Sequence, residues 1–107
     1  MIFKWFDTKD VDALSSRIVR DMIDRVPPAA FEGGGRKAEA KKDRTHDLVL
    51  RQAHDYARDH RLNVFTKARL ANNFKWALLE AGYPKDFVDR MTIELAAVVA
   101  AAESSRG

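Results

Sequence analysis

The chain has 107 residues, of which 46% are hydrophobic, and it contains no cysteine. This length suits one domain and is too short for two ordinary ones, and the lack of cysteine excludes disulfides and cysteine-ligated zinc. The net charge is +3, yet residues 36–75 hold eleven basic and five acidic side chains, whereas residues 1–26 hold five of each. The basicity is therefore local, and a polyanion is expected to bind the middle of the chain.

Residues 1–6 form an aromatic N-terminal arm that contains Phe3, Trp5 and Phe6. Acidic residues follow at once, so the segment lacks the apolar stretch and cleavage site of a signal peptide. The longest strictly apolar run, residues 95–102, is about 12 Å long as a helix, against roughly 30 Å for a bilayer core. We therefore expect a soluble cytoplasmic protein. Its arm packs on its own domain, docks on a partner or second protomer, or lies at a membrane surface.

Helical periodicity dominates the sequence and predicts one all-α domain of four helices over residues 1–107. The first helix is predicted over residues 8–26, where apolar side chains recur on one face and charged ones on the other. Asp7 or Thr8 can cap its start, and Pro27-Pro28 prevents its continuation. Its apolar stripe consists of Val11, Leu14, Ile18, Met22 and Val26.

Residues 27–44 are predicted to form a mobile, Pro/Gly-rich connection between the first two helices. Residues 27–36 hold two of the three prolines and three of the five glycines, which favours an irregular segment. Residues 36–44 have good helix propensity but no apolar stripe. They fit either a solvated extension of the next helix or a disordered segment.

Three further helices are predicted over residues 45–61, 66–81 and 84–103. Gly82, in a left-handed conformation, and Pro84 end the middle one of these. The last two helices are expected to form a core hairpin around residues 82–84, and the first two helices to pack against it. The stripe of the second helix holds Val49, Ala53, Tyr56, Ala57 and His60, with Leu50 at its edge, and that of the fourth holds Phe87, Met91, Leu95, Val98 and Ala102.

The helix at residues 66–81 has two apolar faces, because Phe74 and Trp76 lie about 200° apart around its axis. One face holds Leu70, Phe74, Ala77, Leu78 and Ala81, the other holds Phe65, Ala68, Trp76 and Leu79, and only Thr66, Arg69, Asn73 and Glu80 form a solvent strip. Such a helix must be covered on both sides. Either the other helices of the chain or a second protomer supplies the second cover.

The histidines, glycines and serines do not indicate a chemical site. His46 and His60 would lie about 21 Å apart along one helix, and no histidine pair has the i, i+4 spacing of a helical zinc site. Gly33-Gly34-Gly35 lacks the strand and the motif of a phosphate-binding loop. No serine stands in a pattern that indicates nucleophilic catalysis. We predict no enzymatic activity, metal, cofactor or small-molecule substrate.

Two surfaces remain as candidates for function. The apolar set indicates a protein–protein interaction or self-association module, with an interface of Phe3, Trp5, Phe6, Phe65, Trp76 and Leu79. The alternative is a nucleic-acid-associated helical protein that binds phosphates through residues 36–75, with Arg36, Lys37, Lys41, Lys42 and Arg44 as contacts. Interleaved acidic residues dilute the positive field of that stretch, so the first hypothesis is favoured.

Overall fold

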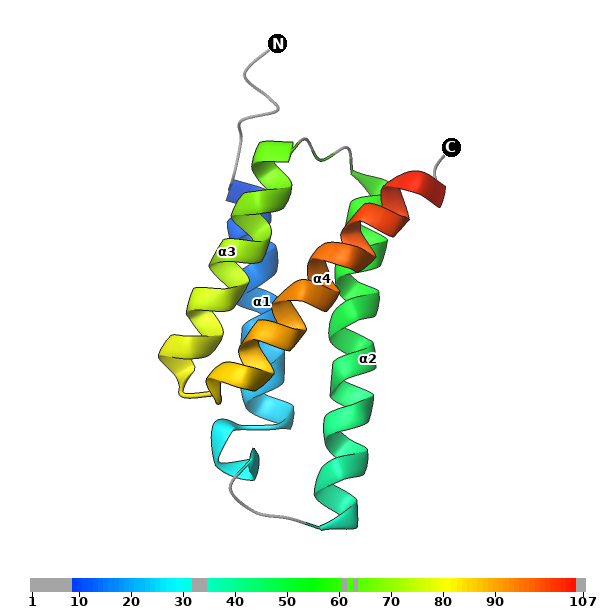
Figure 1. Ribbon diagram of the computed structural model, residues 1–107. Coiled ribbons are helices and arrows are strands. Elements are labelled where there is room, and N and C mark those ends of the chain that lie inside the picture. Colours follow the sequence, from blue (N-terminus) through cyan, green and yellow to red (C-terminus); the bar gives the residue numbers. More distant parts are fainter. Residues whose placement is uncertain (1–8, 32–34, 61, 63, 106–107) are drawn as a thin grey trace.

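The computed structural model describes residues 9–31, 35–60, 62 and 64–105, which form four α-helices and one short 3-10 helix (Figure 1). The helices are α1 (Lys9–Arg25), α2 (Arg36–Asp59), α3 (Val64–Ala81) and α4 (Lys85–Ser105), and the 3-10 helix is η2 (Pro28–Phe31). The predicted all-α class with four helices is therefore confirmed.

The boundary between α3 and α4 is formed by the predicted glycine cap. Gly82 has a φ of 104°, and the backbone N–H groups of Gly82 and Tyr83 donate to the carbonyls of Leu79 and Leu78 at 3.1 and 3.2 Å. This is the hydrogen-bond pattern of a Schellman motif, which favours glycine because of the positive φ. α4 begins one residue after Pro84.

α2 begins at Arg36, so residues 36–44 are a helical extension of the second helix rather than a disordered segment. Alanine, lysine, arginine and glutamate predominate there, and these residues lose little conformational freedom in a helix. Lys42 adds local contacts, since its Nζ lies 3.2 Å from Glu39 Oε1 and 4.5 Å from the centre of the Phe31 ring. Residues 32–34 of the predicted connection lie outside the described residues.

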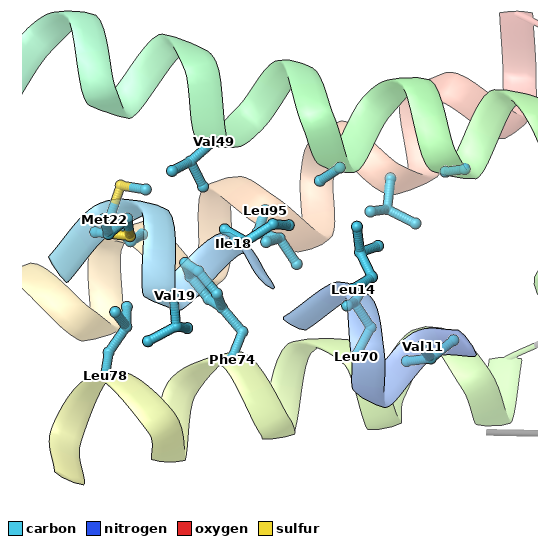
Figure 2. Packing of buried hydrophobic residues seen from close by; sticks show 14 of the residues in the cluster. Val11, Leu14, Ile18, Val19, Met22, Val49, Leu70, Phe74, Leu78 and Leu95 are labelled. Atoms are coloured by element: carbon cyan, nitrogen blue, oxygen red, sulfur yellow. The ribbon is translucent and has the colours of Figure 1, made fainter. Parts of the chain in front are cut away.

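The helices associate as two parallel pairs, α1 with α3 and α2 with α4, which the α3–α4 hairpin joins (Figure 1). The predicted packing of the first two helices against this hairpin is thus observed. Leu70, Phe74 and Leu78 of α3 have no exposed surface, and Figure 2 shows Phe74 pointing toward Ile18 and Val19 of α1. All five residues of the predicted stripe of α1 are buried, as are Val49, Ala53 and Ala57 of α2.

A few residues lie elsewhere than the periodicity predicts. α2 ends at Asp59, so His60 is exposed in an extended conformation, with its ring stacked on Tyr56 at 4.0 Å. Thr66, predicted to face solvent, is buried, because it lies on the same flank of α3 as Asn73, which contacts α1. On α4 the buried line runs through Val88, Met91, Leu95, Val99 and Ala102, so Phe87 and Val98 of the predicted stripe are only partly buried.

Aromatic rings link η2 to the hairpin at one end of the molecule. The ring of Phe31 lies 5.5 Å from that of Tyr83 and 4.5 Å from that of Phe87. The Tyr83 hydroxyl donates to the Val26 carbonyl at 2.7 Å, and burial raises the pKa of Tyr83 to about 12. A Cβ at position 82 would lie 3.7 Å from Pro28 Cβ, so the turn packs closely against the start of η2. This end of the fold is therefore fixed by both apolar and polar contacts.

The substitution Tyr83→Phe should destabilise the fold by about 1 kcal/mol, because it removes the only part of the side chain that donates to the Val26 carbonyl. Urea unfolding followed by circular dichroism measures this loss. The phenol pKa is raised in the folded state, so the bond contributes stability below pH 10 and loses it as the pH rises toward 12. An ultraviolet difference titration of the two proteins should show one phenol ionising near pH 12. A midpoint near 10 would contradict the buried hydroxyl.

A second polar contact holds α1 against α3. Arg69 Nε and Nη2 donate to the two carboxylate oxygens of Asp12 at 2.9 and 3.0 Å, and Asn73 Nδ2 donates to Asp12 Oδ1 at 2.5 Å. The hydrogen bond from Arg69 is the main reason that the pKa of Asp12 lies below its usual value of 3.8. Desolvation opposes this shift, and the charge of Arg69 and the hydrogen bond from Asn73 add to it. Because Asp12 is 40% and Arg69 43% exposed, solvent screens the pair and its main effect is on helix register.

Replacing Asp12 by Asn should lower the free energy of unfolding at pH 7 but not at strongly acidic pH. The Asp12 carboxylate has a lowered pKa in the folded state, so its stabilisation is complete above pH 3.8 and is lost as the pH falls through the folded pKa. Protonated Asp12 has nearly the shape of Asn, so the two proteins should then unfold alike. Urea titrations at both pH values make the comparison, and a difference that persists in acid would exclude the charge as its cause.

Candidate interaction surfaces

The outer face of α3 carries exposed apolar side chains. In the described part of the chain, five large apolar residues are exposed, and three of them lie on α3: Val64 at 80%, Phe65 at 56% and Trp76 at 53%. Phe65 and Trp76 are eleven residues apart, which places them about 20° from one another around the helix and about 16 Å apart along it. They therefore share one side of α3, opposite the buried Phe74.

Between these two aromatic residues lies Arg69, which is bound to Asp12, and the other exposed side chains there are uncharged. Ala68 and Asn72 lie on the same side and are exposed, and Asn72 Oδ1 accepts a hydrogen bond from Trp76 Nε1 at 3.2 Å. Lys75 Nζ lies 5.8 Å from the centre of the Trp76 ring. We call Phe65, Ala68, Asn72 and Trp76 the α3 outer face. The hydrogen bond to Asn72 favours one orientation of the Trp76 indole, which suits a preformed docking surface.

The six residues of the predicted apolar interface are placed differently. Phe65 and Trp76 are exposed on the α3 outer face, whereas Leu79 is partly buried against the core. Leu79 lies in the last turn of α3, next to the α3–α4 turn, where it packs against the core cluster. Phe3, Trp5 and Phe6 lie outside the described residues.

A row of cations occupies the outward side of α2. Lys37, Lys41, Arg44 and Arg51 are all exposed and fall within an arc of about 80° on the helix. We call these four residues the basic ridge. Of the other predicted phosphate contacts, Arg36 is exposed beside the first turn, whereas Lys42 is partly buried and turns toward Glu39 and Phe31. The basic ridge thus includes Arg51, which the predicted set of contacts lacked.

A groove of about 560 Å³ lies between the first half of α2 and the start of α4. Its lining mixes both charges with aromatic rings, namely Phe31, Glu39, Lys42, Asp43, His46, Pro84, Asp86, Phe87 and Arg90. His46 Nε2 contacts Glu94 of α4, and its Nδ1 lies 3.4 Å from Asp47 Oδ1. The groove therefore contains no concentration of one charge that would define a ligand.

Within the described residues, no three His, Cys, Asp or Glu side chains stand close enough together to hold a metal ion. The helices in those same ranges also include none whose length and hydropathy would let it cross a membrane. Comparison with known proteins finds no family model that matches the chain, and no curated protein or solved structure that is significantly similar to it. The two surfaces on α3 and α2 are therefore interpreted on their chemistry alone.

Proposed function

We propose that the protein is a small helical interaction module that binds another protein chain through the α3 outer face. The observation that carries this proposal is Trp76, which is 53% exposed on a helix whose opposite side is fully buried. A tryptophan at such a place leaves a large apolar area in water, and tryptophan is the residue type most enriched among the main energetic contacts of protein interfaces.

The composition of the α3 outer face supports a protein partner. Ala68 is a small exposed side chain between Phe65 and Trp76, which leaves room for a residue of a facing helix to insert between the two rings. Arg69, the charged residue between the two rings, is already engaged, since it binds Asp12. An arriving chain would thus bury apolar area without removing an unpaired charge from water, which keeps the desolvation cost low.

The first partner to test is a second copy of the chain, because a single helical face can pair with itself about a two-fold axis. Analytical ultracentrifugation over a concentration series should show a mass that rises toward that of a dimer. Trp76→Ser should weaken this self-association by at least about 30-fold, the effect of losing one central aromatic contact. Phe65→Ser should act in the same direction.

Ile93→Ser is the matched control, because Ile93 is 70% exposed but lies on α4. This variant should associate like the unchanged protein. If the unchanged protein stays monomeric at every concentration, a photoreactive amino acid at position 76, compared with one at position 93, tests for a different protein partner in the native cell. The absence of a crosslink specific to position 76 would then contradict the proposal.

A further inference from the structure

The basic ridge has a geometry that counting charges along the sequence does not reveal. Between Lys37 and Arg51 no acidic residue falls inside its arc, since Asp43 and Asp47 lie about 80° and 40° beyond its edge. The next acidic residue in line, Asp55, lies one turn past Arg51 and is 3.7 Å from Arg58. The interleaved acids therefore dilute the average charge of the segment but not the charge of this side of the helix.

The four cations of the basic ridge have no ionic partner among the described residues, in contrast to the paired Lys42, Arg58, Arg69 and Lys85. Their helix also extends past the α3–α4 turn, so its start lies beyond the end of the hairpin (Figure 1). The positive charge is thus both uncompensated and accessible from solvent.

The start of α2 places charges of the wrong sign for helix stability. Arg36 and Lys37 occupy the first turn, where the helix dipole is positive and where cations are unfavourable, and Glu39 is the only acid there. The N-cap is Gly35, and among the described residues no side chain caps this end of the helix. A bound anion would relieve this repulsion, so the start of the helix favours an anion in the same way as the charges of the ridge do.

We infer that the basic ridge binds the phosphodiester backbone of a nucleic acid. The ridge runs about 21 Å along the axis of α2, and the phosphates of one strand in a duplex follow one another at about 3.4 Å of axial rise. A straight row of four cations therefore spans the axial length of roughly six base pairs, and it meets phosphates where the winding backbone strands cross it. Such contacts position a protein on nucleic acid without reading its sequence.

A membrane surface fits the basic ridge less well. Stable attachment to anionic lipid needs exposed apolar side chains next to the cations. In the described part of the chain, the large exposed apolar residues are Ile23, Val64, Phe65, Trp76 and Ile93, and α2 carries none of them. Binding to the phosphates of a nucleic acid requires only positive charges, which the basic ridge presents.

The test is fluorescence anisotropy with the full chain and labelled DNA and RNA duplexes of random sequence. With four phosphates neutralised, the logarithm of the binding constant should fall against that of salt concentration with a slope of about −3 to −4. The affinity should accordingly drop about 100-fold between about 50 and 200 mM salt. Because the contacts are to the backbone, similar affinity for the DNA and RNA duplexes is expected. A preference for one of them would identify whether the ligand is DNA or RNA.

The double variant Lys37→Gln and Lys41→Gln should bind at least about 10-fold more weakly, with a salt slope smaller in magnitude by about 2. Arg20→Gln with Arg25→Gln is the matched control, because it removes the same charge from exposed positions of α1. This control should change affinity by less than about 3-fold. Circular dichroism must show unchanged helix content in both.

Several outcomes would overturn the inference. The first is a lack of binding at low salt. The second is an equal loss of affinity in the control variant, because the effect would then follow from net charge alone. Polyglutamate of matched charge that competes as well as duplex would indicate an acidic protein as the ligand instead. Vesicles containing phosphatidylserine that compete equally well would indicate a lipid surface.

Discussion

The structure depends on the burial of one side of α3. Leu70, Phe74 and Leu78 have no exposed surface and lie where α3 meets both α1 and α4, so this line of side chains connects the two helix pairs. A helix with 3.6 residues per turn that points Phe74 inward must point Trp76 outward. The partial exposure of a large indole, which forgoes on the order of 1 kcal/mol of burial, is therefore a consequence of the register that forms the core.

Much of this fold could be predicted because its strongest local signals agree with the tertiary packing. The apolar stripe of α1 is sufficient to predict that helix. Gly82 is sufficient to predict the end of α3, because the turn needs its positive φ, and Pro28 packs against this turn in the folded chain. Residues 36–44 were ambiguous because an extended helix without an apolar stripe has no periodic signal. Its order depends on contacts such as that of Lys42 with Phe31, which only the folded chain brings together.

The surfaces were less predictable than the core. Periodicity identified two apolar faces on α3 but contained no information on how far neighbouring helices reach around it, so it grouped the partly buried Leu79 with the exposed Trp76. For α2, the mixture of basic and acidic residues along residues 36–75 concealed the charge of one side of the helix. Charges along a sequence are separated by rotation around the helix axis, and this separation places Lys37, Lys41 and Arg44 on a side free of acids.

The two surfaces lie on helices that make little contact with each other, although only residues 60–63 separate α2 from α3. Substitutions on them should accordingly have independent effects on stability. Binding can nevertheless be linked. A dimer formed through α3 would carry two basic ridges on one particle, and the second ridge would meet a long nucleic acid at a high effective concentration once the first had bound. Four cations per chain would give only modest affinity, so pairing two ridges would strengthen a weak contact without any new contact on α2.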